Sequence, residues 1–127
     1  MSAVAVREAT PDERHAVMNV LDGAMLEVET DRVASDTTTT LVACEGDRVL
    51  GALVLDGEEI LGVAVRRARR GQGIGTALVE TAAARRERLV AEFGDRERPF
   101  YESLGFETTP LGGGRLRGVR VDSAAEE

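Results

Sequence analysis

A short segment of arginines and glycines is the first part of the sequence whose residue types could do chemistry. It reads RRARRGQGIGTALVE, residues 66–80, and lies between an apolar stretch and a segment with helical spacing. If a strand leads into it and a helix follows, the backbone N–H groups of residues 71–76 lie at the positive end of the helix dipole without carbonyl partners. Glycines at 71, 73 and 75 let a ligand approach this backbone closely. The segment therefore predicts a site for an anion such as a pyrophosphate.

Two common phosphate-binding motifs do not match this segment. A P-loop ends in Gly-Lys-Ser/Thr, and the chain contains no lysine. A dinucleotide-binding motif requires Gly-x-Gly-x-x-Gly, but counting from Gly71 and Gly73 the third position is Thr76. The segment also does not lie in a first strand–helix–strand unit with an acidic residue following it. Neither class of nucleotide-binding site is expected.

The elements before the glycine segment are predicted from periodicity and capping. Residues 3–7 alternate between apolar and polar, as in a half-buried strand. Thr10, Pro11 and Glu13 form a capping box with proline at the first helical position, so a helix should begin at Pro11. Its apolar face would consist of Val17, Val20, Leu21, Ala24 and Val28. Residues 29–38 have neither period and are expected to form a connecting loop or one short helical turn.

Three strands, over residues 40–46, 49–57 and 58–66, are predicted to form an antiparallel meander, because Gly46-Asp47 and Asp56-Gly57 are turn-forming pairs. After the glycine segment, a helix is expected from Thr76 to about Arg88, with an apolar stripe of Leu78, Ala82 and Leu89. The chain then continues with a strand over 89–93, a short helix over 99–104 and a hairpin around Gly112-Gly113-Gly114 that ends in residues 115–121. Together these elements indicate an α/β fold.

Composition limits the class of protein. The chain has 127 residues, enough for one domain, expected over residues 1–121 with a disordered tail at 122–127. Its net charge of −7 argues against a nucleic-acid or anionic-membrane partner, and no apolar run reaches transmembrane length. One histidine and one cysteine make a metal site implausible, with His15 expected in solvent and Cys44 in the core. Without a signal-peptide pattern at the start, a cytoplasmic location is expected. A basic complement made only of arginine, beside many acidic residues, is typical of a halophilic or GC-biased source.

Two motifs carry a resemblance to a known family. The first is Arg-x-x-Gly-x-Gly from Arg70 to Gly75, preceded by LGVAVRRA, and the second is RPFYESLGF over residues 98–106. Together they resemble the signatures of the GCN5-related N-acetyltransferases, the GNAT family, and the element order agrees along nearly the whole chain. The resemblance implies a mixed, mostly antiparallel sheet flanked by helices, in which the fourth and fifth strands run parallel and splay apart. The alternative for the first motif alone is a glycine-rich turn followed by solvated arginines.

The resemblance also implies the ligand, an acyl-coenzyme A and normally acetyl-CoA. Its pantetheine arm would enter the gap between the splayed strands and pair with the backbone of Val63 and Val65. The pyrophosphate would be held by Arg70 and by the backbone of Gly71, Gln72, Gly73, Gly75 and Thr76. The neighbouring arginines, Arg66, Arg67 and Arg69, would add positive charge around the phosphates of a ligand that an acidic protein otherwise repels.

Acetyl transfer to an amine requires a neutral amine, a polarised thioester carbonyl and a proton for the leaving thiolate. In the family the carbonyl partner is a backbone N–H, here near Val63. Tyr101, the only tyrosine, matches the family position of the general acid, and its alternative role is that of a packing aromatic. Glu59 and Glu92 are the candidate bases, although both could be surface charges. These residues give the hypothesis of direct attack by a primary amine within a ternary complex.

The sequence departs from the family pattern in two places. The family often has an asparagine after the fifth strand that helps to bind CoA, and Gly94 or Asp95 stands there. The connection before the second strand is also too short for the further helix that usually covers the acceptor, so the acceptor cleft is either open or completed by a second subunit in a homodimer. The main alternative function is a catalytically silent acyl-CoA-binding module on the same fold. A nucleic-acid factor using residues 66–70 is a weaker alternative, because the chain is acidic.

Overall fold

A computed structural model describes residues 4–23 and 38–121 of the chain. In chain order the described strands are β1 (Ala5–Glu8), β2 (Thr38–Glu45), β3 (Arg48–Asp56), β4 (Glu59–Val65), β5 (Arg88–Gly94), β6 (Glu107–Gly112) and β7 (Arg115–Val121). The α-helices are α1 (Arg14–Gly23), α3 (Ile74–Arg85) and α4 (Arg98–Ser103). Three short 3₁₀ turns, η1 (Pro11–Glu13), η2 (Arg67–Arg69) and η3 (Asp95–Glu97), lead into the helices or into the glycine segment.

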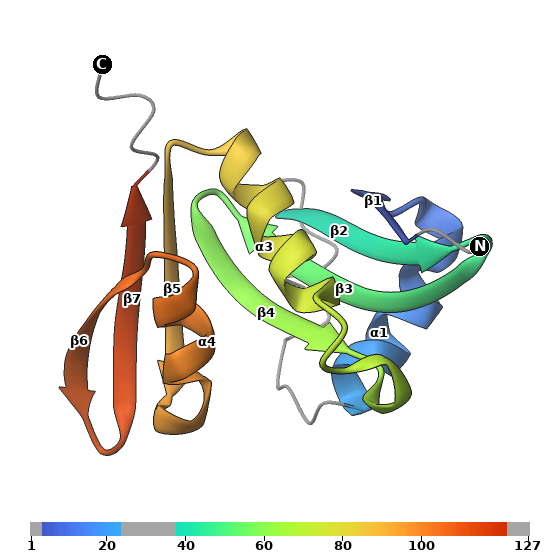
Figure 1. Cartoon of the computed structure of the whole chain (residues 1–127). Coiled ribbons are helices and arrows are strands. Elements are labelled where there is room, and N and C mark those ends of the chain that lie inside the picture. Colours follow the sequence, from blue (N-terminus) through green and yellow to red (C-terminus); the bar gives the residue numbers. More distant parts are fainter. Residues whose placement is uncertain (1–3, 24–37, 122–127) are drawn as a thin grey trace.

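The described strands form one seven-stranded sheet in the order β1-β2-β3-β4-β5-β7-β6. Every neighbouring pair is antiparallel except β4 and β5, which run parallel. Figure 1 shows β4 and β5 diverging, with α3 crossing the sheet on one side of the gap and α4 packed beside β5 on the other. The predicted mixed, mostly antiparallel sheet flanked by helices is confirmed.

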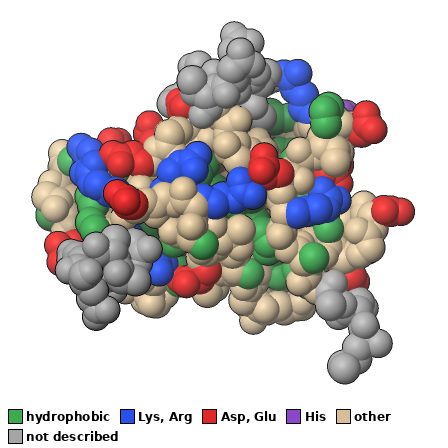
Figure 2. Space-filling view, turned by 90° about the horizontal axis from the view of Figure 1, so that it is seen from above, with side chains coloured by type: hydrophobic (Ala, Val, Ile, Leu, Met, Phe, Trp, Pro, Cys, Tyr) green, Lys and Arg blue, Asp and Glu red, His purple; other side chains and the backbone are tan. Residues whose placement is uncertain are grey.

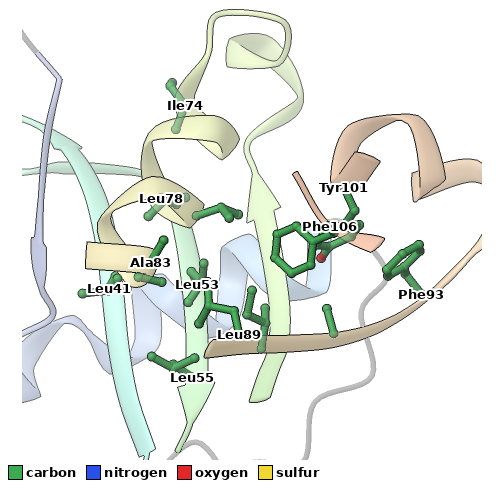
Figure 3. Close-up of a cluster of buried hydrophobic side chains, with 14 of the residues drawn as sticks. Leu41, Leu53, Leu55, Ile74, Leu78, Ala83, Leu89, Phe93, Tyr101 and Phe106 are labelled. Atoms are coloured by element: carbon green, nitrogen blue, oxygen red, sulfur yellow. The ribbon is translucent and has the colours of Figure 1, made fainter. Parts of the chain in front are cut away.

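Helices cover both faces of the sheet. On one face α3 and α4 bury Leu78, Val79 and Tyr101 against Leu53 and Phe93 of the strands. Figure 3 shows this core, in which Tyr101, Phe93 and Phe106 gather at the end nearest α4. On the other face α1 packs its buried stripe against β2, β3 and β4, and this stripe consists of Val17, Val20 and Leu21 as the spacing predicts. Ala24 and Val28, the other two predicted members, lie outside the described residues.

The predicted capping box forms at the first helical turn. The Thr10 backbone N–H donates to Glu13 Oε1 at 2.9 Å, and Pro11 opens the turn. Arg7 of β1 adds a bidentate ion pair, with both terminal nitrogens 2.8 Å from the two Glu13 oxygens. These contacts, the side-chain bond to Arg7 first, lower the pKa of Glu13 from 4.5 to about 2. The ionised carboxylate thus ties the start of the helix to the edge of the sheet.

A Glu13→Gln variant is expected to lose about 1 kcal/mol of stability at neutral pH, because the cap and the ion pair are weakened. The Glu13 pKa is depressed in the folded state, so its contribution is fully present above pH 4.5 and is lost as the pH falls toward about 2. Urea unfolding of the two proteins should therefore differ at pH 7 and converge below pH 3. An equal difference at both pH values would contradict this account.

Several element boundaries differ from the predicted ones, and three of them concern α3 and the β3–β4 turn. Helix α3 begins at Ile74, two residues early, because Gly73 already serves as its N-cap. It ends at Arg85, three residues before the predicted end, because β5 begins at Arg88 and Leu89 is buried as a strand residue rather than as part of the helical stripe. The β3–β4 turn falls at residues 57–58 rather than 56–57. At the second and third of these boundaries, sheet pairing takes residues that helical or turn propensity would also accept.

The surface around the C-terminal end of α3 carries charges of both signs. In Figure 2, which looks onto this end from above, acidic and basic side chains are interspersed rather than gathered by sign. Ion pairs join Arg85 to Glu8, Arg88 to Glu58, and Arg120 to Glu80.

His15 is exposed and Cys44 is buried, as predicted. Among the described residues, no helix is long and apolar enough to cross a membrane. The predicted loop over 29–38 lies almost wholly outside the described residues, and the tail over 122–127 does so completely.

Candidate acyl-donor and acceptor cleft

The gap between β4 and β5 begins immediately after the two strands meet. Their parallel ladder consists of Glu59 opposite Val90 and Ile60 opposite Ala91, and the Val90 N–H donates to the Glu58 carbonyl at 2.8 Å. From there β5 pairs along its whole length with β7, and β4 continues along β3. The two halves of the sheet therefore share one short seam and separate toward the C-terminal ends of both strands.

A β-bulge in β4 lies at the point of separation. Leu55 of β3 faces Ile60 and Val54 faces Gly62, which leaves Leu61 as an extra residue on β4. The extra residue reverses the side-chain alternation, so Ile60 and Val63 pack on the α3 face although they are three residues apart, while Leu61 packs on the α1 face. A bulge bends its strand and leaves backbone groups unpaired. Here it turns β4 away from β5.

The exposed edge of β4 presents backbone groups to the gap. The Arg66 N–H donates to the Leu50 carbonyl of β3 at 2.8 Å. Because the N–H and C=O groups of successive strand residues point to alternate sides, those of Val63 and Val65 point away from β3 and toward β5. In this structure the Val65 carbonyl accepts a bond from Arg70 Nε at 3.1 Å. The two predicted pantetheine-binding positions therefore lie on the unpaired edge, with an arginine at the outer one.

The gap is hollowed into a cleft of about 980 Å³. Residues from both faces of the sheet line it, because its walls include side chains of the α3 face, such as Val63 and Tyr101, and of the opposite face, such as Leu61 and Glu92. The cleft thus passes through the sheet. Two molecules could enter it from opposite sides and meet between the strands.

The glycine segment forms one rim of this cleft. Gly71 and Gly73 have φ angles of +79° and +81°, which L side chains rarely adopt, and Gly73 caps α3 in the left-handed conformation. The Ala77 N–H is the first to bond into the helix, to the Gly73 carbonyl at 3.0 Å, so the earlier N–H groups have no intrahelical partner. Gly75 lies close to the Phe100 ring, and Thr76 is exposed in the first turn. The predicted anion-binding geometry is present.

The four neighbouring arginines have different surroundings. Arg70 lines the cleft. Arg66 Nε donates to the Val49 carbonyl at 2.7 Å, and Arg69 bonds to Gln72 Oε1 at 2.8 Å and pairs with Glu45 at 3.2 Å. Arg67 is exposed on the 3₁₀ turn. Two of the arginines thus fix the segment to β2 and β3, so that holding the glycines in place is a role that the sequence alone did not indicate.

Tyr101 lies at the other wall of the cleft, on α4. Its ring stacks on Phe93 at a centroid distance of 4.2 Å and meets Phe100 and Phe106 edge-on at 5.1 and 5.2 Å. The residue is 7% exposed, and burial raises its pKa from 10.0 to about 12, with a smaller effect of the charge of Glu97. The Tyr101 hydroxyl makes no hydrogen bond within the described chain. Every fully buried side-chain polar atom in that part of the chain has a partner, so the hydroxyl is not fully buried, and it opens onto the cleft. It is therefore a protonated donor held by three aromatic rings.

The aromatic cluster depends on a glycine in β7. A Cβ added to Gly118 would lie 2.8 Å from Phe93 Cε1 and 3.3 Å from Phe106 Cδ2, and Tyr101 holds both rings in place. A Gly118→Ala variant is therefore expected to lose about 1–3 kcal/mol of stability in urea unfolding, as overpacked cores do. Gly75→Ala is the matched control, because its Cβ would meet Phe100 no closer than 3.4 Å. Equal stabilities of the two variants would contradict this packing.

The two candidate bases lie on the face opposite Tyr101. In β5, Ala91 and Phe93 point to the α3 face, so Glu92 between them points to the other face, where it is exposed and lines the cleft. Glu59 stands opposite Val90 at the closed seam and is not among the cleft-lining residues. The structure thus places Glu92 at the cleft with Tyr101, on the opposite side of the sheet, and places Glu59 at the end of the gap.

Several cleft residues were not singled out by the sequence. Phe93, Phe100, Arg96 and Arg115 all line the cleft, and Gly94 lines it where the family often has asparagine. The signal for Arg115 in the sequence is weak, because a residue on β7 reaches the cleft only through the pairing of β7 with β5. The alternation of RLRGVRV does place Arg115 and Arg117 on one face, opposite Leu116.

Comparison with known proteins supports one family. Residues 36–108 match the family model for the acetyltransferase (GNAT) domain. A search of curated proteins finds no significant match. Among solved structures, the fold is shared with the PaiA N-acetyltransferase of Thermoplasma acidophilum in complex with coenzyme A, with a TM-score of 0.78 and 13% identity over 94% of this chain and 99% of that one.

Two further solved structures share the fold. The ribosomal-protein-S18-alanine N-acetyltransferase of Escherichia coli aligns with a TM-score of 0.77 and 15% identity over 94% of each chain. The IAA acetyltransferase of Bacillus cereus aligns with a TM-score of 0.71 and 21% identity over 94% of this chain and 100% of that one. The family model spans more than half of the chain, and the splayed strands, the glycine segment and the aromatic wall lie where the resemblance implies them. The chain belongs to the GNAT acetyltransferase family.

Proposed function

We propose that the protein transfers an acetyl group from acetyl-CoA to a primary amine by direct attack within a ternary complex. The observation that carries the proposal is the cleft through the sheet, with an anion-binding segment at one rim and candidate acid and base on opposite faces. A donor and an acceptor that enter from the two faces would meet where β4 leaves β5. This arrangement suits a direct transfer, because neither molecule has to leave before the other binds.

The donor would occupy the side of α3 and α4. Its pyrophosphate would lie on the N–H groups of residues 71–76, a placement that the helix dipole and the positive φ of Gly71 and Gly73 favour. Its pantetheine amides would pair with the unpaired edge of β4 at Val63 and Val65, where the Arg70 side chain would give up the Val65 carbonyl. The coenzyme A complex of a protein with this fold supports the same choice of ligand.

The chemistry would proceed without a covalent enzyme intermediate. Glu92, on the acceptor side, would take a proton from the ammonium form of the acceptor, and the neutral amine nitrogen then forms the C–N bond with the thioester carbonyl carbon. The surplus proton of that nitrogen would replace the proton that Tyr101 gives to the sulfur. A backbone N–H of β4 near Val63 would stabilise the oxyanion, and the C–S bond would break as the carbonyl reforms. Tyr101 stays protonated at neutral pH because burial raises its pKa to about 12, so it would donate a proton to the departing sulfur.

Calorimetric titration with acetyl-CoA and with free CoA, at low and high salt, tests the donor site first. Micromolar binding of both is expected, followed by CoA release when a primary amine is added. Binding without turnover on a broad panel of amines would instead favour a silent acyl-CoA-binding module. The absence of binding would overturn the proposed function and leave only the shared fold.

A further inference from the structure

The acceptor side of the cleft carries two arginines next to Glu92. On β7, Leu116 points into the core, so Arg115 and Arg117 point to the opposite face, which is the face of Glu92. The register places Arg117 directly opposite Glu92 and Arg115 opposite Gly94, two residue pairs toward the wide end of the gap. Arg115 lines the cleft. Two positive groups and one carboxylate therefore share one side of the opening.

These two arginines are unpaired, unlike most others. Neither forms an ion pair or a side-chain hydrogen bond within the described chain, and Glu92, although directly across from Arg117, is farther than 4.0 Å from it. Elsewhere in the described residues, carboxylates pair with the arginines at 7, 69, 85, 88, 98 and 120. In a chain with a net charge of −7, two exposed and unpaired guanidinium groups thus share one face of β7, and one of them, Arg115, lines the cleft.

The other charged groups near these arginines come from β6 and from the turn before α4. Thr109 of β6 stands opposite Arg117, and Glu107 stands opposite Val119, two residues farther from the wide end. Glu97 and Arg96 line the cleft from the turn before α4. Glu92 is thus the acidic group directly opposite Arg117, while Asp95, whose N–H donates to the Gly114 carbonyl, lies beside the residue that precedes Arg115. The pair remains available to an anion that enters from the acceptor side.

We propose that the acceptor amine also carries a carboxylate, which Arg115 and Arg117 hold while the amino group faces Glu92. This inference rests on the proposed function, because the donor must occupy the opposite side with its own phosphates at residues 71–76. Guanidinium groups bind carboxylates through two parallel hydrogen bonds, and alternate residues of one strand lie about 7 Å apart on the same face, a separation that suits two such groups around one anion. The negative charge of Glu92 favours a monoanionic carboxylate over a doubly charged phosphate.

Matched amines with and without a carboxylate test the inference: glycine with methylamine, β-alanine with ethylamine, and 4-aminobutyrate with propylamine. Rates of CoA release are compared at equal concentrations of the neutral amine. For at least one pair, the KM of the carboxylate-bearing amine is expected to be at least about tenfold lower than that of the plain amine, as charge-assisted hydrogen bonds imply. Arg115→Gln and Arg117→Gln should each raise that KM and leave the KM of the plain amine unchanged. Arg48→Gln is the matched control and should change neither KM, because Arg48 is an exposed arginine at the start of β3 without an ion pair in the described chain.

The outcomes separate this inference from the proposed function. If acetyl-CoA does not bind to the wild-type protein, the proposed function itself fails. If acetyl-CoA binds and plain amines react as well as their carboxylate partners in every variant, only the inference is overturned. A tenfold loss of CoA affinity in Arg115→Gln would also overturn it, by assigning the arginine to a donor phosphate. If no amine reacts, titration of the CoA complex with the N-acetylated carboxylates decides: binding weakened by Arg115→Gln supports the inference, and no binding overturns it.

Discussion

A Tyr101→Phe variant is expected to acetylate amines about 100-fold more slowly than the wild type, with an unchanged affinity for CoA. The change removes the hydroxyl that opens onto the cleft and keeps the ring that stacks on Phe93. Loss of a positioned proton donor typically costs about two to four orders of magnitude in rate. Steady-state CoA release at saturating donor measures the effect, and calorimetry checks that CoA still binds.

The pH dependence of stability provides an independent control on Tyr101. Its pKa is raised from 10.0 to about 12 in the folded protein, so its neutral form stabilises the fold fully below pH 10 and this contribution is lost as the pH rises toward 12. The phenylalanine variant should therefore lose less stability than the wild type over that interval. A variant with normal turnover would show that Tyr101 is a packing residue and that another group protonates the sulfur.

A Gly73→Glu variant is expected to weaken acetyl-CoA binding by at least about 100-fold, through two effects. The φ angle of +81° costs an L residue about 1–3 kcal/mol unless the loop moves, and movement would displace the N–H groups that face the pyrophosphate. A carboxylate at the N-cap would also compete with, and repel, the phosphates. Calorimetric titration of the folded variant with acetyl-CoA measures the loss.

Gly57→Glu is the matched control for this change. Gly57 has a similar φ of +61° with open space around its Cβ position, so backbone strain and added charge are comparable. It lies in the β3–β4 turn, where its carbonyl accepts a bond from Arg86 beyond the C-terminal end of α3. Its substitution should leave acetyl-CoA affinity unchanged. An equal loss in both variants would mean that general destabilisation, rather than the anion site, explains the result at Gly73.

Local signals predicted the elements and motifs that depend on neighbouring residues. The capping box at Thr10 and Glu13 and the turns with glycine follow from residue types a few positions apart. The resemblance then supplied the parallel pairing of β4 with β5, which the structure confirms. No periodicity in a single sequence contains that pairing, because the two strands are separated by a helix.

Features that depend on distant contacts were not predicted. The bulge at Leu61 arises because β4 must follow β3 and leave β5, and EEILGVAVR alone is compatible with unbroken alternation. The sequence predicted Arg66 and Arg69 near the phosphates of the ligand. It did not predict their contacts with Val49 and Glu45, because these residues belong to strands more than fifteen residues away in the chain. Arg115 reaches the cleft only through the antiparallel ladder of β7 with β5. Sequence spacing shows which residues share a face, and tertiary pairing decides what that face meets.

The short seam between β4 and β5 leaves few backbone bonds between the two halves of the sheet. Two residue pairs join the half formed by β1–β4 to the half formed by β5, β7 and β6, so packing in the core carries most of the contact between them. A bound pantetheine arm that bonds to the edge of β4 and packs against Tyr101 would add contacts between the two halves of the sheet. Ligand affinity and rigidity of the protein would then rise together, and a saturating ligand would raise the melting temperature by mass action.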